Sequence, residues 1–342
     1  MQQAVAQVLS EEYEPVFSAN SYGFRPNRCA QDTIQKVVAN AGEGYEYVID
    51  LDLARFFDTV NHSKLLQVLS KTIKDGRVIS LIHKFLRAKI RDGEKIITPT
   101  VAPQGGPISP ILDNILLNEL DQEQESRGHR FVRYADDMMI MCKSLRAAKR
   151  VYESISRFIE KKLLLSINTE KTKICSLGAN VKFPGYTFIK GKLGKDTEST
   201  WHASVHAKLR RKLRFQLKSI INRKLIGGLR VVQQKLSMQL GGWFNEFRLG
   251  IRKSLVRDLD GWLRRRIRQI YWKQCKRIRT KYEKLRKLGI SHEKAYEWAN
   301  TSKSYWRVAG SAILKTTLTS KVLRSEGWED LDLYFKGTSY SC

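Results

Sequence analysis

Two pairs of acidic residues stand where the sequence predicts the ends of buried strands. Asp136 and Asp137 lie between the apolar runs RFVRY and MMIMC, a pattern that favours a hairpin with both carboxylates at its tip. Asp50 and Asp52 alternate within the β-branched segment 45–53, so they share one face of a strand. Adjacent like charges at the ends of buried strands are costly unless cations neutralise them. These residues therefore indicate a metal site.

Magnesium chemistry follows if segment 45–53 lies beside the hairpin. Asp52 and Asp136 would then hold two Mg²⁺ ions, which at a separation of about 3.5–4 Å activate a 3′-hydroxyl and stabilise a leaving pyrophosphate. Such a reaction depends on positioning and charge more than on covalent help from the protein. The alternative is a solvated hairpin turn, a place that Asp often occupies.

The charge balance points to a polyanionic partner. The chain has 342 residues, and 62 Lys and Arg stand against 34 Asp and Glu, a formal charge of +28. Nucleic acid is the leading candidate, and a cationic protein of the ribosomal or secreted kind is the alternative. Five cysteines without a CxxC pair and six scattered histidines argue against a zinc site and a disulfide framework.

Most of the surplus charge lies in one segment. Residues 201–290 hold 26 Lys and Arg against four acidic residues, a net charge of +22. The polar stretch 191–200 precedes this segment and is typical of a hairpin tip or linker. We therefore expect one domain over 1–195 and a second over 196–342.

The pattern of apolar residues predicts an α+β first domain and an all-α second domain. Helical periods occupy 29–40 and 63–90. A further helix should begin with Ser109 as N-cap and Pro110 at its first position and end at Gly128, and Ser144 should cap the next. Downstream of 205 every strong period is helical.

Six motifs give the chain a family resemblance. They are YADD (134–137), DLARFFDTVNH (52–62), SYGFRPNR (21–28), APQGGPISPILDNILLNELD (102–121), LLSINTEKTKI (164–174) and FPGYTF (183–188). In order and spacing they resemble the conserved blocks of reverse transcriptases. The tail, with GGWFNEF (241–247) and GWLRRRIR (261–268), is similar to the thumb and maturase domain of group II intron-encoded proteins.

The resemblance implies a fold, an activity and partners. It implies a right-hand-like polymerase palm with partial fingers over 1–195, an antiparallel sheet with packed helices. A basic α-helical thumb and maturase domain would follow over 196–342. The activity would be RNA-directed DNA polymerisation with two Mg²⁺ ions, coupled to splicing and mobility of a group II intron. The partners would be intron RNA, a DNA primer or target, and dNTPs.

The resemblance also assigns catalytic roles. It makes Asp52 and Asp136 metal ligands, adds the Leu53 carbonyl, and matches Asp137 to the second carboxylate of the acidic box. The alternative for Asp137 is support of the turn. Lys171 matches a lysine that protonates departing pyrophosphate, and a surface lysine is the alternative.

Further residues match the family's substrate contacts. Phe57, five residues after Asp52, would clash with a 2′-hydroxyl and so select dNTPs, unless it is a core residue and Phe56 faces the substrate. Gln104 would contact the incoming nucleotide, while Gly105 lets the backbone approach closely. The turn that grips the primer would comprise Phe183, Gly185 and Tyr186.

Two groups of cations are candidates for RNA contacts. Arg25 and Arg28 either touch template phosphates or form salt bridges within their loop. In the tail, cations at helical spacing bind phosphates, while most of the interleaved aromatic residues belong to the core. The tail candidates are Arg210, Arg211, Arg264, Arg265, Arg268 and Lys273.

The sequence opens at what resembles the second block of the family, without the fingers extension and first block that normally precede it. A separate fingers fragment or a homodimer could supply them. The alternative function is a polymerase-deficient maturase that binds RNA as a splicing cofactor, and a defence-associated reverse transcriptase is a third. The family's C-terminal endonuclease motifs do not follow. No apolar run suggests a membrane span, so we expect a cytoplasmic, nucleoid-associated protein of bacterial type.

Overall fold

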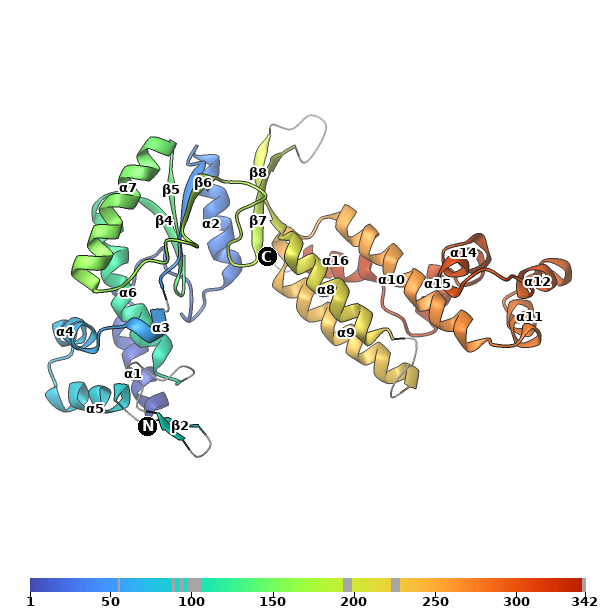
Figure 1. The fold of residues 1–342 in the computed structure, drawn as a ribbon, viewed down its shortest axis with the longest axis horizontal. Coiled ribbons are helices and arrows are strands. Elements are labelled where there is room, and N and C mark those ends of the chain that lie inside the picture. Colours follow the sequence, from blue (N-terminus) through green and yellow to red (C-terminus); the bar gives the residue numbers. More distant parts are fainter. Residues whose placement is uncertain are drawn as a thin grey trace. The chain divides into compact units, whose positions relative to one another are not determined.

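The computed structural model describes residues 1–54, 56–87, 90–92, 95–97, 106–192, 199–222 and 228–339. The chain divides into two compact units, Met1–Ala203 and Ser204–Cys342, drawn in Figure 1. The boundary expected after residue 195 lies earlier than this division, between strands β7 (Tyr186–Gly191) and β8 (Thr200–Val205). These two strands pair with each other.

A four-stranded antiparallel sheet organises the first unit. It consists of β1 (Tyr47–Leu51), β4 (Arg130–Tyr134), β5 (Asp137–Cys142) and β6 (Lys173–Ser176), in the order β4-β5-β1-β6. Strand β1 pairs with β5 on one side and with β6 on the other. The sheet therefore places the strand of the first acidic pair beside the hairpin of the second, as the metal-site hypothesis required.

Helices cover both faces of this sheet. Figure 1 shows α7 (Leu145–Phe158) on one side of the strands and α2 (Ala30–Gly42) on the other. Helix α6 (Ser109–Ser126) is buried along most of its length. The remaining helices of this unit are α1 (Gln2–Tyr13), α3 (Phe56–Thr59), α4 (His62–Thr72) and α5 (Gly76–Leu86). A short strand pair, β2 (Ile90–Asp92) and β3 (Lys95–Ile97), completes it.

The helix boundaries follow local capping chemistry. Ser144 caps α7 by accepting a hydrogen bond from the Ala147 amide, as expected. Helix α6 begins one residue earlier than expected, because Ile108 is its N-cap. The period over 63–90 forms two helices, since Asp75 caps the start of α5 through the Arg77 amide.

The described part of the second unit is helical after β8, as the sequence predicted. Its long helices are α8 (Ala207–Ile220), α9 (Gly228–Glu246) and α10 (Lys253–Gln274). The shorter ones are α11 (Ile278–Lys287), α12 (His292–Ala299), α13 (Tyr305–Ala309), α14 (Ala312–Thr317), α15 (Ser320–Ser325) and α16 (Leu331–Ser339). Leucines of α8, α9 and α10 share one apolar core. None of the described helices combines the length and apolar content that a bilayer crossing requires.

Candidate active site

The acidic turn (residues 134–137) is a tight hairpin between β4 and β5. Tyr134 pairs directly with Asp137, which leaves Ala135 and Asp136 as the two turn residues. Ala135 has a φ of 58°, the left-handed conformation that such hairpins require at their first central position and that glycine usually supplies. The hairpin expected from the apolar pattern is confirmed, and it holds Ala135 in a strained backbone conformation.

Strand pairing brings the two acidic pairs to the same end of the sheet. Leu51 pairs with Met138, so the next step along both strands sets Asp52 opposite Asp137. Although Asp137 keeps solvent access, the surrounding protein raises its pKa, and the carboxylates of Asp136 and Asp52 raise it further. Burial, followed by the Asp137 and Asp52 charges, raises the pKa of Asp50 to about 6. The carboxylates therefore form one electrostatically coupled group.

Asp52 is held by the segment that follows α7. Its amide donates to Thr172 Oγ1 at 3.2 Å, and its carbonyl oxygen accepts from the Asn168 amide at 2.9 Å. Lys171 Nζ lies 3.4 Å from Asp52 Oδ2, while its side chain stays 68% exposed. Lys171 is thus both a surface lysine and a neighbour of the predicted metal ligand. Leu53 forms an isolated antiparallel bridge to Ile167.

This group of carboxylates fits divalent cations. Among the described residues no three His, Cys, Asp or Glu side chains form a ready-made metal cluster. Mg²⁺ does not need one, because one or two protein carboxylates and the phosphates of a substrate complete its oxygen shell. Burial raises the pKa of Asp137 first, and the carboxylates of Asp136 and Asp52 raise it further, so a cation bound among them would relieve their mutual repulsion. The donor set therefore suits magnesium.

A buried network that the sequence analysis missed holds the acidic turn in place. Arg133 and Asp121 are both fully buried and form an ion pair. Arg133 Nε lies 2.9 and 3.0 Å from the two carboxylate oxygens, and Nη1 donates to Asn114 Oδ1 at 2.8 Å and to the Ala135 carbonyl oxygen at 2.9 Å. Charged residues inside the apolar segments of β4 and α6 were the available signal.

Asp113 is a second residue that the sequence analysis missed. It lies in α6, and burial, followed by the charge of Asp136, raises its pKa to about 7. Its Oδ2 atom is buried, and none of the described residues forms a hydrogen bond with it. A carboxylate in the middle of the apolar run PILDNILL was the signal, since such a group is seldom buried without a reason.

The loop around Gly23 packs directly on the acidic turn. The Tyr22 amide donates to the Arg133 carbonyl oxygen at 2.9 Å, and Asn114 Nδ2 donates to the Gly23 carbonyl oxygen at 2.9 Å. A Cβ atom at Gly23 would lie 2.2 Å from the Ala135 nitrogen. Only glycine allows this approach, so the SYGFRPNR motif supports the turn through its backbone.

The two arginines of this loop bond within it. Arg25 is buried and pairs with Glu14 at 2.7 Å, and its Nη1 donates to the carbonyl oxygens of Ser18 and Ser21. Arg28 Nη1 donates to the Ala19 carbonyl oxygen at 2.7 Å. Of the alternatives for Arg25, the structure shows the loop salt bridge. A phosphate contact would require the buried Arg25 guanidinium to give up these bonds, and the role of both arginines in RNA binding stays a prediction.

The predicted substrate contacts are described only in part. Gln104 and Gly105 lie outside the described residues, as does the side chain of Phe57. Phe56 is buried in the core. Its orientation is the one that the Phe57 hypothesis needs, because one ring of the pair had to be internal.

The predicted primer-grip segment forms a closed turn. Phe183 and Tyr186 exchange backbone hydrogen bonds of 3.0 and 3.2 Å, and Gly185 between them has a φ of 90°. This is the geometry of a turn with Pro and then Gly at its centre. Both aromatic side chains are buried, so any contact with a primer would come from the backbone of the turn.

Three arginines of α10 point into the second unit. Arg264 pairs with Asp260, and Arg268 Nε donates to the Leu318 carbonyl oxygen at 2.9 Å. Arg265 Nη2 donates to the Trp306 carbonyl oxygen at 3.0 Å. These contacts engage all three guanidinium groups within the unit, and the role of Arg264, Arg265 and Arg268 in RNA binding stays a prediction. Because α10 packs against the short helices, its guanidinium groups satisfy carbonyl oxygens there.

The other cations predicted to contact RNA lie nearer the surface. Arg210 and Arg211 are exposed on α8, and Lys273 near the end of α10 is half-buried. Their role in RNA binding stays a prediction. Helix α8 thus presents exposed cations, whereas the arginines at the centre of α10 are engaged within the unit.

Comparisons with known proteins agree with the geometry of both units. Residues 1–188 match the family described as reverse transcriptase (RNA-dependent DNA polymerase). The chain belongs to the reverse transcriptase family. Residues 210–289 match the maturase-specific domain of group II introns. The combination of a reverse transcriptase domain and a group II intron maturase domain confirms the resemblance drawn from the motifs.

Named relatives place this reverse transcriptase beside intron-encoded proteins. Protein YkfC of Escherichia coli is 30% identical over 229 residues, 56% of this chain and 60% of YkfC. Group II intron-encoded protein LtrA of Lactococcus lactis is 28% identical over 251 residues, 54% of this chain and 42% of LtrA. The match thus spans about half the length of these relatives. Among solved structures, telomerase from Candida albicans aligns with 99% of this chain and 58% of its own at 12% identity and a TM-score of 0.48.

Proposed function

We propose that the chain is the polymerase and maturase part of a group II intron-encoded protein. It copies intron RNA into DNA and assists splicing and mobility of the intron. The observation that carries the proposal is the coupled group of carboxylates at one end of the β4-β5-β1-β6 sheet, where Asp136 and Asp137 face the strand of Asp52. The match of a maturase-specific domain to the basic helical tail supports the RNA partner.

The carboxylates are proposed to hold two Mg²⁺ ions. Asp52 and Asp136 would be the shared ligands, with Asp137 and the Leu53 carbonyl as further ones. When bound, such ions activate a 3′-hydroxyl and stabilise a leaving pyrophosphate. The protein's own part is preorganisation: the buried Arg133 holds the acidic turn through the Ala135 carbonyl oxygen.

Lys171 is proposed to have two tasks. Its ammonium lies 3.4 Å from Asp52 Oδ2, close enough to hold that carboxylate in the absence of metal. Because its side chain is mostly exposed, it can turn towards a departing pyrophosphate and give it a proton. Lys171→Met should then slow primer extension, because the departing pyrophosphate would no longer receive a proton from this side chain.

The substrates of the proposed reaction are dNTPs, a DNA primer and an RNA template. Phe57 would exclude a 2′-hydroxyl and Gln104 would contact the nucleotide. The backbone turn at Gly185 would support the primer end. The second unit would hold structured intron RNA.

The test is primer extension by the full chain on an RNA template with Mg²⁺ and dNTPs. Asp136→Asn should lower the rate at least about a hundredfold, the loss expected when one preorganised electrostatic group is removed, and affinity for intron RNA should stay within a few-fold. Asp75→Asn is the matched control, because Asp75 caps α5 on the surface and Asn caps equally well. Wild-type rates in Asp136→Asn would refute the metal-ligand role.

A further inference from the structure

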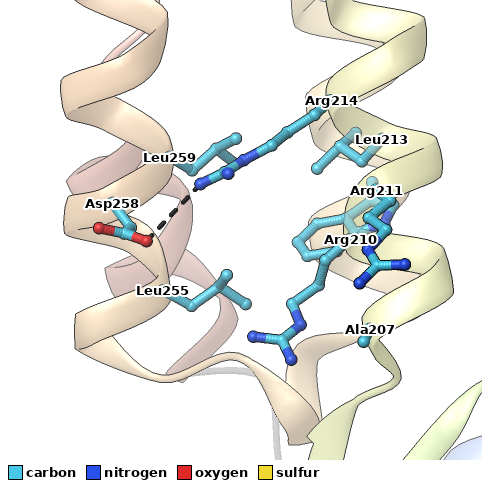
Figure 2. A pocket seen from close by; sticks show the side chains of 9 residues that line it. Ala207, Arg210, Arg211, Leu213, Arg214, Leu255, Asp258 and Leu259 are labelled. Carbon is cyan, nitrogen blue, oxygen red and sulfur yellow. Dashed lines mark ion pairs between the residues drawn. The ribbon is translucent and has the colours of Figure 1, made fainter.

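The second unit contains a groove between α8 and α10, shown in Figure 2. It has a volume of about 250 Å³. Three arginines of α8 line it (Arg210, Arg211 and Arg214), and we call it the arginine groove. Leu213 lines it from α8, while Leu255 and Leu259 line it from α10. The groove thus combines a cationic wall with an apolar floor.

The arginines of this groove differ from those of α10 in their partners. Arg210 and Arg211 are exposed, and the described residues offer neither of them a carboxylate within ion-pair distance. Arg214 Nη2 lies 3.6 Å from Asp258 Oδ2, and the Asp258 side chain is 79% exposed. Two guanidinium groups are therefore free for a ligand, in contrast to Arg264 and Arg268, which are engaged inside the unit.

The helix ends add to the positive potential. Ala207 and Leu255 lie at the same end of the groove in Figure 2, so α8 and α10 both begin there. Neither helix has an acidic residue in its first turn. Arg252, the N-cap of α10, makes no side-chain capping bond, whereas His206 caps α8 by accepting a hydrogen bond from the Lys208 amide. Helix N-termini carry partial positive charge and free amides. With three arginines against one aspartate, the groove attracts an anion.

We propose that the arginine groove binds a phosphodiester group of an RNA strand. The proposal rests on the function proposed above, because it names where the maturase part holds RNA. Arg210 and Arg211 would take the phosphate, since guanidinium matches phosphate geometry. The apolar floor of Leu255 and Leu259 would pack against the sugar. A volume of about 250 Å³ is below that of most small-molecule pockets and suits a backbone segment.

Asp258 allows a test in which a substitution should strengthen RNA binding and not weaken it. Its carboxylate repels a phosphate and draws Arg214 aside. Asp258→Asn should therefore tighten RNA binding about two- to fivefold, the range of an exposed ion pair. If the groove only stabilises the fold, Asp258→Asn should instead weaken RNA binding, because the loss of the ion pair with Arg214 would loosen the packing of α8 on α10.

The main experiment compares charge removal on two sides of one helix. Binding of a fluorescein-labelled RNA stem–loop to the full chain is measured over a salt series. Arg211→Gln should weaken binding about tenfold and lower the slope of log affinity against log salt by roughly 0.7–0.9 per lost contact. Lys212→Gln is the control, because successive helix residues turn by about 100°, and Lys212 is exposed but does not line the groove.

Alkylation locates the ligand directly. Ala207 lines the groove, so RNA should protect Ala207→Cys from iodoacetamide several-fold, whereas Ser219→Cys, exposed near the other end of α8 and outside the groove lining, should react as in free protein. Protection by inorganic phosphate alone, at the same phosphate concentration, would assign the groove to a free anion and overturn the RNA assignment.

The outcomes separate this proposal from the proposed function. If wild type binds the stem–loop and Arg210→Gln/Arg211→Gln binds it with equal affinity and slope, the groove proposal fails while the maturase function stands. If wild type does not bind the stem–loop, both fail. Circular dichroism melts confirm that each variant folds.

Discussion

The buried ion pair of Arg133 and Asp121 should be the most sensitive point of the first unit. Asp121→Asn keeps the shape of the side chain and removes its charge. The Arg133 guanidinium, which is fully buried, is then left without a counter-charge beneath the acidic turn. We expect the first unit to be strongly destabilised and primer extension to fall, because Arg133 also holds the Ala135 carbonyl oxygen.

The expected loss of stability in Asp121→Asn follows from the burial of the ion pair. Removal of one partner of a buried pair costs about 3–5 kcal/mol, because the other charge stays desolvated. A domain with a total stability of about 5–15 kcal/mol would lose a large share of it. The double variant Asp121→Leu/Arg133→Met removes both charges and should recover most of the stability. It should not recover activity, since the bond to Ala135 is lost in it.

Hydrogen exchange of amides in β4 and β5 is the suitable assay, because it reports opening of the first unit alone. Glu119→Gln is the matched control. Glu119 lies on the same helix, α6, and pairs with Lys71 at 2.5 Å, but the Lys71 side chain is 56% exposed. An exposed pair contributes only about 0–1 kcal/mol. If Asp121→Asn costs no more than Glu119→Gln, the assignment of Arg133 as the support of the turn is refuted.

Three further predictions concern the same unit. The pKa of Asp113 in the folded chain is about 7, against an ordinary 3.8, so the stability that its protonated form contributes is fully present below pH 3.8 and is lost as the pH rises through 7. In EDTA, the stability of Asp113→Asn relative to wild type should therefore rise by an amount on the order of a few kcal/mol between pH 5 and 8. A stability difference that stays constant over this range in urea titrations would show that Asp113 does not titrate there. Gly23→Ala places a Cβ 2.2 Å from the Ala135 nitrogen and should lower primer extension at least about tenfold by displacing the turn, whereas Gly42→Ala meets open space and should be neutral. Phe57→Ala should lower the ratio of kcat/KM for dNTP over NTP in single-nucleotide incorporation, and an unchanged ratio in a folded variant would return Phe57 to the core.

The acidic end of the sheet was predictable from the sequence because its signals are local. Apolar runs on either side of Asp136 and Asp137 specify a hairpin with these carboxylates at its tip, and alternation in 45–53 specifies the strand of Asp52. The pairing of β1 with β5 was only a hypothesis at that point, since it joins segments about ninety residues apart and pairing partners leave no local trace.

The tertiary structure decided which charged residues are free. Periodicity showed that Arg264, Arg265 and Arg268 can lie close together on a helix, but it does not show whether a neighbour covers that face. In the folded chain these three guanidinium groups bond to carbonyl oxygens and to a carboxylate. Arg210 and Arg211 on α8, by contrast, stay exposed.

The same reason accounts for the residues that were missed. Asp113 and Arg133 stood in apolar segments, so their burial could be suspected. The raised pKa of Asp113 comes from burial and from Asp136, and the role of Arg133 comes from its bonds to Asp121 and Ala135. The sequence by itself determined where carboxylates and cations stand along the chain and which elements carry them. Only the tertiary structure decided which of these charges meet, because burial and electrostatic coupling depend on residues that are distant in the sequence.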